Sequence, residues 1–340
     1  MSLLSVKDLY TSFFTSSGEV KAVNGISFNL EEGKVLGIVG ESGSGKSVTA
    51  YSILQILTNP GRIVSGSIKL KGQELVGCSK EYMQKIRGNQ ISIIFQDPMT
   101  SLNPVFTIGN QLMEAILLHT KRNKEEAKDR AIEMLKLVGV NEPEKRIEQY
   151  PHEFSGGMRQ RVMIAMALAC EPDILIADEP TTALDVTIQA QILDLMKELQ
   201  KKLSMAIILI THDLGVVAEM CDDIIVMYAG QISERGTSDD IFYNPKHEYT
   251  KGLLKSIPTV QDEKLRLKPI GGNPVDLLNM PDGCPFASRC ENAMKVCLTV
   301  NPVELKINDK HATRCWMYAR EEIENGTLTK KQVEEMYHGK

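Results

Sequence analysis

The chain has 340 residues, 42% of them apolar and 24% charged, and its 39 basic and 44 acidic side chains give a formal net charge of −5. This balance is typical of a globular protein with a substantial core, and it lacks the overall basic field that attracts nucleic acid. Residues 1–14 do not resemble a secretory signal, and no segment approaches the ~20 apolar residues of a membrane-spanning helix. The length predicts two domains, or one domain with insertions.

Two aromatic side chains stand out in the N-terminal segment. Residues 3–34 are predicted to form short strands, with a turn at Ser17-Gly18. Phe13 and Phe14 come just before this turn, where either ring can stack on a nucleotide base. Taken alone, the pattern is explained better by core packing of a strand aromatic.

A glycine-rich stretch fits the pattern G-x-x-x-x-G-K-[ST], which is typical of phosphate-binding loops in nucleotide hydrolases. Its residues are Gly40, Glu41, Ser42, Gly43, Ser44, Gly45, Lys46 and Ser47, and Val48 follows within the same predicted site. The apolar run 35–39 predicts a buried strand, and residues 47–57 predict a helix. In this position the backbone N–H groups can bind phosphate oxygens, Lys46 can neutralise phosphate charge and Ser47 can bind Mg²⁺. A turn without function is the weaker explanation.

A helical insert is predicted after the strand Ile91–Phe95 and the polar residue Gln96, which can bind Mg²⁺ and position a water molecule. Residues 105–170 show helical apolar spacing. Near their end, Ser155 is predicted to cap a helix, and Gly156 and Gly157 expose its first N–H groups. This makes a second anion-binding helix start, although a plain capped helix explains the segment alone.

Two further apolar strands are predicted, and each ends in polar residues. The strand 174–177 leads into Asp178 and Glu179, and the strand 206–210 leads into His212. Asp178 can hold Mg²⁺, Glu179 can act as general base on an attacking water, and His212 can contact a γ-phosphate. Solvated acids and a structural histidine are the alternatives, but polar groups converging at several strand ends indicate a site.

In this order, the motifs resemble those of the ATP-binding cassette (ABC) ATPases over roughly residues 1–250. The matches are the phosphate loop 40–47, Gln96, the signature Phe154-Ser155-Gly156-Gly157-Met158, the pair Asp178-Glu179, the D-loop Ala183-Leu184-Asp185 and His212. The signature more often reads Leu-Ser-Gly-Gly-Gln, but Ser155 and both glycines are intact. The resemblance implies an α/β P-loop NTPase core with an N-terminal antiparallel β subdomain, formed by residues 1–104 and 171–250, and a helical subdomain at 105–170.

The resemblance also implies how the site works. A pair of such cassettes would sandwich ATP head to tail, each nucleotide lying between one subunit's phosphate loop and the partner's signature. Gln96, Glu179 and His212 would be catalytic, and Ser47, Gln96 and Asp178 would hold Mg²⁺. Phe13 would be the base-stacking aromatic, ahead of Phe14. The partner-facing part of the nucleotide site would comprise Ser155, Gly156, Gly157 and Asp185.

The tail, residues 251–340, contains four of the seven cysteines in a C-x5-C-x6-C-x17-C pattern. They are Cys284, Cys290, Cys297 and Cys315. Without a secretory signal, cysteines indicate a reducing compartment and favour a metal or cluster over disulfides. The spacing lacks the tight C-x2-C knuckles of most zinc sites. By itself it leaves an iron–sulfur cluster, zinc and scattered free thiols equally open.

The segments 281–286, 289–290, 315–316 and 96–104 narrow the resemblance to the ATPases of oligopeptide and dipeptide importers. This resemblance implies a structural [4Fe–4S] cluster at the four cysteines, with zinc as the alternative. It also implies a peripheral subunit on the cytoplasmic face of the inner membrane. Its partners would be a second ABC ATPase, identical or not, two permeases and an external peptide-binding protein. The permeases would contact the region of Gln96 and residues 99–118.

Two other functions compete with this prediction. Nickel and oligosaccharide importers use the same type of ATPase, and the sequence does not choose among cargoes. A soluble ABC-type ATPase acting on DNA or ribosomes is the more distant alternative. The single cassette, the short helical insert without sustained heptads and the acidic balance disfavour it, and no nucleic-acid partner is predicted.

Overall fold

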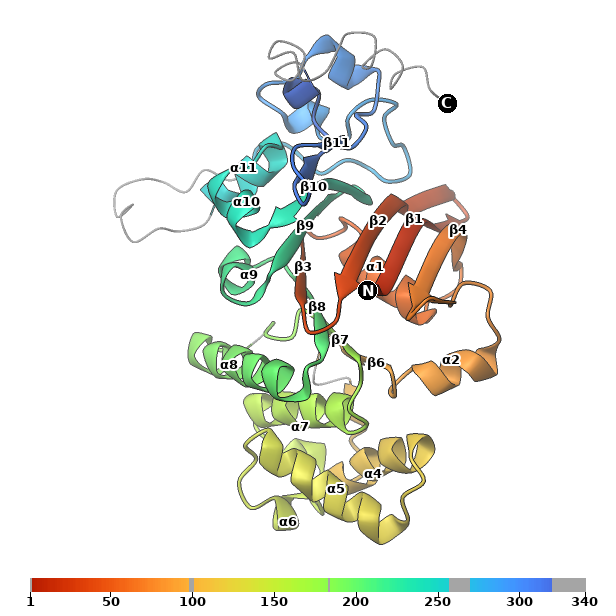
Figure 1. The fold of residues 1–340 in the computed structure, drawn as a ribbon, viewed down its shortest axis with the longest axis vertical. Helices are drawn as coiled ribbons and strands as arrows, with labels where there is room; N and C mark the ends of the chain where they lie inside the picture. Colours follow the sequence, from red (N-terminus) through yellow and green to blue (C-terminus); the bar gives the residue numbers. More distant parts are fainter. Residues whose placement is uncertain (1, 98–100, 183, 257–269, 320–340) are drawn as a thin grey trace.

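The computed structural model describes residues 2–97, 101–182, 184–256 and 270–319. Figure 1 shows a central sheet, with a small antiparallel sheet beside it, a helical region at one end and the C-terminal segment at the other. Within the described residues, no helix is both long and apolar enough to cross a bilayer.

The N-terminal sheet is antiparallel, in the order β2-β1-β4-β5. Its strands are β1 (Ser2–Thr15), β2 (Gly18–Glu31), β4 (Gly61–Leu70) and β5 (Gln73–Glu74). The expectation of several short strands in 3–34 was wrong, because β1 and β2 each run for 14 residues. Register shifts interrupt their pairing, and such bulges bend a strand without ending it.

The central sheet has the strand order β11-β12-β10-β9-β3-β8-β7-β6. The four pairs β9–β3, β3–β8, β8–β7 and β7–β6 are parallel. The pairs β9–β10, β10–β12 and β12–β11 are antiparallel. The strands of the parallel part are β3 (Val35–Val39), β6 (Ile91–Ile94), β7 (Ile174–Asp178), β8 (Ala206–Thr211) and β9 (Asp223–Tyr228). Every residue of β3, β7 and β8 is buried, as expected for strands covered on both faces.

Helices flank the central sheet. They are α1 (Lys46–Leu54), α2 (Lys80–Ile86), α8 (Val186–Leu203), α9 (Leu214–Met220), α10 (Ser238–Tyr243) and α11 (Glu248–Lys255). The predicted helix at 47–57 is α1, which begins at Lys46, within the last two residues of the glycine-rich stretch, and ends three residues earlier than expected.

The predicted helical insert is present and forms the yellow and light-green end of the molecule in Figure 1. It contains α4 (Ile108–His119), α5 (Lys124–Leu137), α6 (Pro143–Arg146), the 3-10 helix η1 (Pro151–Glu153) and α7 (Gly156–Leu168). Its core includes Leu112, Ile116 and Met134, which are at most 2% exposed. A capping box of Asn123 and Glu126 fixes the start of α5.

The C-terminal segment 270–319 has little regular structure. It contains the 3-10 helices η2 (Ala287–Arg289) and η3 (Lys295–Leu298) and the short strands β11 (Leu305–Lys306) and β12 (Ala312–Thr313). β12 pairs with β10 (Gln231–Thr237), so the segment extends the central sheet. A small cluster centred on Trp316 forms its core, and the Trp316 indole N–H donates to Val300 O at 2.9 Å.

Candidate active site

The glycine-rich loop joins β3 to α1 and curls around the side chain of Lys46. Gly40 has φ of 151° and Gly45 has φ of 103°. A Cβ at Gly40 would lie 2.2 Å from Met227 O, and one at Gly45 would lie 2.4 Å from Ala22 O. The Lys46 ammonium donates to Gly40 O at 2.7 Å and Glu41 O at 3.0 Å. Burial lowers the pKa of Lys46, against the opposing charges of nearby acids.

A hydroxyl from the start of α1 and a carboxylate from the end of β7 meet beside this loop. Ser47 Oγ donates to Asp178 Oδ1 at 2.9 Å. Burial raises the pKa of Asp178, against the opposing hydrogen bonds of Ser47 and Tyr51. Its Oδ2 atom is buried and has no hydrogen bond of standard geometry among the described residues. Such an oxygen is costly unless a cation binds it. The oxygen donors and the unpaired atom fit Mg²⁺, which prefers such ligands.

Glu179 is the centre of a hydrogen-bond network formed by three strand ends. Gln96 Nε2 donates to Glu179 Oε2 at 3.0 Å, and His212 Nδ1 lies 3.2 Å from Oε1. Thr182 Oγ1 also donates to Oε2 at 2.9 Å. Burial acts to raise the pKa of Glu179, but hydrogen bonds from His212 and Thr182 outweigh it and hold this pKa below its usual value. Glu179 is therefore a charged, oriented carboxylate, as a general base requires.

The backbone of Glu179 is unusual, because its φ is 49°. A left-handed conformation is uncommon outside glycine, and such residues are enriched at functional sites. The conformation follows directly on β7 and turns the side chain into the network formed with Gln96 and His212.

A cavity of about 560 Å³ opens beside these groups. Its size lies within the usual range for ligand sites. It combines predicted site residues with residues of the C-terminal part that the sequence did not indicate. The lining residues are Val39, Gly40, Glu41, Ser42, Gln96, Glu179, His212, Leu214, Leu253, Ser256 and Ile270.

The signature segment lies away from this cavity. Ser155 caps α7 as predicted, and its Oγ accepts the Met158 N–H at 3.4 Å. Asp185 caps α8 and accepts the Ile188 N–H at 3.0 Å. Neither Ser155 nor Asp185 lines the cavity that contains Glu179 and His212. Ala183 of the predicted D-loop lies outside the described residues.

The two candidate base-stacking aromatics lie in different surroundings. Phe13 is half-buried and pairs with Gly61 of β4 across the N-terminal sheet. Phe14 is 38% exposed, with the Arg62 guanidinium 4.1 Å above its ring. The choice of Phe13 over Phe14 stays a prediction.

Comparison with known proteins decides the family. A family model described as ABC transporter matches residues 23–182, and one described as oligopeptide/dipeptide transporter, C-terminal region, matches residues 233–297. The chain is 55% identical over 316 residues to the dipeptide transport ATP-binding protein DppD of Bacillus subtilis, covering 93% of this chain and 94% of the relative. The chain belongs to the ABC transporter family. As an ABC ATPase, it is an ATP-hydrolysing subunit.

Other relatives and solved structures agree with this membership. The oligopeptide transport ATP-binding protein OppD of Escherichia coli is 53% identical over 302 residues, which cover 89% of each chain. An ATP-binding cassette solved as a dimer in a post-hydrolysis state, with ADP and Pi, has a TM-score of 0.62 at 27% identity. It covers 69% of this ABC subunit and 98% of that chain. The predicted core fold is thereby confirmed.

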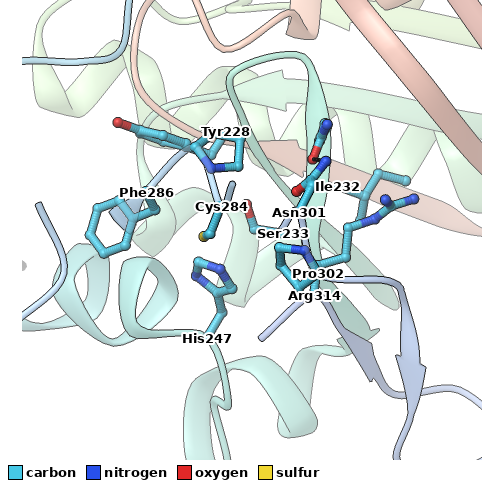
Figure 2. Close-up of a pocket in the computed structure, with 11 residues that line it drawn as sticks. Tyr228, Ile232, Ser233, His247, Cys284, Phe286, Asn301, Pro302 and Arg314 are labelled. Carbon is cyan, nitrogen blue, oxygen red and sulfur yellow. Dashed lines mark hydrogen bonds between the residues drawn. The ribbon is translucent and has the colours of Figure 1, made fainter. Parts of the chain in front are cut away.

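The four cysteines of the ABC subunit's C-terminal segment come near one another, but they do not form a metal site in this structure. Cys284 N donates to Cys297 O at 2.8 Å, and Cys284 lines a small cavity with Tyr228 and His247, shown in Figure 2. Burial raises the pKa of Cys284 to about 12. Among the described residues, no group of three or more Cys, His, Asp or Glu side chains is arranged to hold a metal ion. The predicted cluster is therefore not supported by the arrangement of the thiols.

Proposed function

We propose that this ABC subunit drives the import of dipeptides or oligopeptides. The observation that carries the proposal is the match of residues 233–297 to the C-terminal region of oligopeptide/dipeptide transporters, together with relatives named for dipeptide and oligopeptide transport. The ATPase would act at the cytoplasmic face of the cell membrane. A pair of permeases, a second ATPase and an external peptide-binding protein would complete the importer.

In the proposed division of labour, residues 1–104 and 171–250 form the ATPase core, 105–170 the helical subdomain and 251–340 the extension. Within the core, Lys46 and the loop amides bind phosphates, Ser47, Gln96 and Asp178 hold Mg²⁺, and Phe13 stacks on the base. When bound, Mg²⁺ would neutralise phosphate charge. Glu179 accepts a proton from the attacking water, and His212 fixes Glu179 and contacts the γ-phosphate.

The proposed ATP sandwich requires a second subunit. Ser155 and Asp185 do not line the cavity that contains Glu179, so a complete site would take its signature from the partner. The helix start after Ser155 would then face the γ-phosphate, with Gly156 and Gly157 allowing close approach. A related cassette has been solved as a dimer, which supports this arrangement.

The permease contact is proposed at an apolar groove beside Gln96. The groove has a volume of about 350 Å³ and lies between β6, the segment after it and the helical region. Phe95, Leu102 and Met163 are among its lining residues, and Phe95 is 39% exposed. A partner helix seated here would touch both the strand end that leads to Gln96 and the helical region. Replacing Ala115 by Asp should uncouple transport from hydrolysis, and intact coupling would count against this contact.

A trapped pulldown tests the importer. A Glu179→Gln variant is held in MgATP with gently solubilised membranes, and the co-purifying proteins are identified. Two permeases and a second cassette ATPase are expected. Ribosomal proteins or DNA without a permease would contradict the membrane role.

An uptake assay then tests the cargo. Cells lacking the chain are complemented with the wild type or with Glu179→Gln, and uptake of labelled dipeptides, longer peptides, Ni²⁺ and oligosaccharides is compared. Only peptide uptake should require the wild-type chain. Restoration of Ni²⁺ or oligosaccharide uptake alone would favour the alternative importers.

We also propose that Cys284, Cys290, Cys297 and Cys315 bind a [4Fe–4S] cluster, with zinc as the alternative. In support, Cys284 N donates to Cys297 O at 2.8 Å, which joins two of the four cysteine-bearing segments. The thiols would have to turn toward a common centre. Oxygen-free purification should give about four irons per chain. Cys290→Ser should lose them and Cys78→Ser should not, whereas one zinc per chain or no metal would overturn the cluster.

A further inference from the structure

An arginine of the C-terminal extension is joined to the second residue of the phosphate loop. Arg289 Nη1 donates to Glu41 Oε2 at 2.5 Å, and Arg289 Nη2 donates to Glu41 Oε1 at 2.9 Å. The Arg289 side chain is 3% exposed, and that of Glu41 is 28% exposed. Two parallel bonds from a guanidinium to a carboxylate fix both position and orientation, which a single point charge does not.

Arg289 is itself held rigidly. Its Nε donates to Gly271 O at 2.9 Å, and Nη2 also reaches Ile270 O at 3.3 Å. The guanidinium carbon lies 5.8 Å from the ring centres of both Tyr228 and Phe286. The extension therefore presents a preorganised cation to the phosphate loop.

The main chain of Glu41 is fixed from the same side. Its N–H donates to the hydroxyl of Tyr249 in α11 at 2.7 Å. Tyr249 is fully buried and packs against Tyr228 and Phe286, the rings that flank Arg289. Both the backbone and the side chain of Glu41 are thus held by residues C-terminal to β9, outside the loop itself.

The charge of Glu41 makes this attachment matter for nucleotide binding. Glu41 belongs to a loop that must accept a polyanion, and it lines the cavity that contains Glu179 and His212. The backbone carbonyl of Glu41 accepts a hydrogen bond from the Lys46 ammonium at 3.0 Å. The Glu41 carboxylate therefore belongs to a residue that already contacts the phosphate-binding cation. Without Arg289, the carboxylate would repel phosphate and compete for Lys46, because like charges in a partly desolvated site interact strongly.

We propose that Arg289 is a positioning residue for ATP: it holds the Glu41 carboxylate out of the phosphate site and neutralises it, so that the C-terminal extension sets the nucleotide affinity of the phosphate loop. The proposal concerns ATP binding by this ABC ATPase. It depends neither on the cargo nor on a cluster at the cysteines.

Equilibrium ATP binding and steady-state hydrolysis test the proposal in the full chain. If Arg289→Ala leaves about a tenth of the loops competent to bind, the Kd for ATP rises about tenfold. KM should rise in parallel while kcat stays within about twofold, because the lost interaction acts equally on bound substrate and transition state. Adding Glu41→Gln to Arg289→Ala should restore most of the affinity, since no unpaired carboxylate remains.

Arg235 supplies the matched control. Arg235 Nε and Nη2 donate to the two carboxylate oxygens of Glu304 at 3.2 and 2.6 Å, which also anchors the extension but does not touch the loop. Arg235→Ala should lower the melting temperature as Arg289→Ala does and leave the Kd for ATP unchanged. Arg289→Lys keeps the positive charge but cannot make the two parallel hydrogen bonds of a guanidinium, so it should give an intermediate Kd.

Several outcomes would overturn the proposal. One is an unchanged Kd in Arg289→Ala, and another is an equal rise in Arg235→Ala. A third is failure of Glu41→Gln to restore affinity, which would mean that Arg289 acts only by stabilising the fold. If Arg289→Ala does not fold, Arg289→Lys is used in its place. A wild-type Kd in Arg289→Lys alone, or a raised Kd that Glu41→Gln does not lower, would then refute the role.

Discussion

Ser47 and Asp178 lie 131 positions apart in the sequence, yet their side chains are joined by a 2.9 Å hydrogen bond. The bond links the phosphate loop to the end of β7. The second carboxylate oxygen of Asp178 is buried and has no hydrogen bond of standard geometry among the described residues. Ser47 and Asp178 therefore supply oxygen ligands of the kind that a hard cation such as Mg²⁺ prefers.

The first prediction concerns Mg²⁺ dependence. ATP at about 100 times its Kd should stabilise the wild-type chain by about 2.7 kcal/mol, and EDTA should remove much of this effect. In Asp178→Asn the stabilisation should be small with or without Mg²⁺, because the charged ligand is lost. Thermal unfolding with ATP, with and without EDTA, measures this.

Asp173 is the control for this experiment, because it precedes β7 at the opposite end and pairs with Lys71 at the surface. Asp173→Asn should keep the full response to Mg²⁺. An equal loss in both variants would show that any acid near β7 affects binding, and it would remove Asp178 from the cation site.

The second prediction concerns the general base. Glu179→Gln and Glu179→Ala should lower kcat at least about a hundredfold, because proton transfer in the transition state is lost. ATP affinity should stay close to that of the wild type, since Glu179 is not needed to hold the phosphates. Phosphate release and ATP binding are measured in parallel, with Glu219→Gln on α9 as a surface control. Near-normal turnover in the Glu179 variants would refute this assignment.

The sequence predicted those parts of the site that lie within short, continuous stretches of the chain. The glycine-rich loop, the cap at Ser155 and the polar residues after β7 and β8 are each encoded in a few consecutive residues, and parallel strands bring their carboxyl ends together. The 14-residue strands β1 and β2 were missed, because bulges hide the alternation that marks a strand.

Long-range partners were not predictable from the same patterns. Arg289 binds Glu41 although 248 positions separate them in the sequence. No sequence motif indicates that either residue is the partner of the other. Ile270 reaches the cavity through the irregular C-terminal segment, which has no periodicity to read. The contact of Thr182 with Glu179 was predictable but was not predicted. A hydroxyl three residues after an acid at a strand end is well placed to donate a hydrogen bond to that acid.

The third prediction concerns the division of the ATP site between subunits. Ser155→Ala should leave ATP binding by the isolated chain unchanged, because Ser155 does not line the cavity of its own chain. In the assembled ATPase pair, turnover should fall roughly tenfold if one hydrogen bond to a charged phosphate is lost. Isothermal binding on the isolated chain and hydrolysis by the purified complex separate the two effects.

Thr107 is a matched control for Ser155. It caps α4 by accepting the Asn110 N–H at 3.3 Å, just as Ser155 caps α7. Each substitution by Ala should cost about 1 kcal/mol of stability through the lost cap. Thr107→Ala should nevertheless leave turnover intact. Equal loss of turnover in both variants would mean that helix stability, and not phosphate contact, explains the effect of Ser155.

The fourth prediction concerns pH and the hydroxyl of Thr182. Its hydrogen bond helps to hold the pKa of Glu179 below the usual value, so the carboxylate stays charged as pH falls until that lowered pKa is reached. Removing the hydroxyl raises the pKa, and the base is then protonated at a higher pH. The acid limb of kcat should therefore move to higher pH in Thr182→Val, while exposed Thr299→Val should match the wild type. An unmoved acid limb, or a shift to lower pH, would show that another group limits hydrolysis in acid.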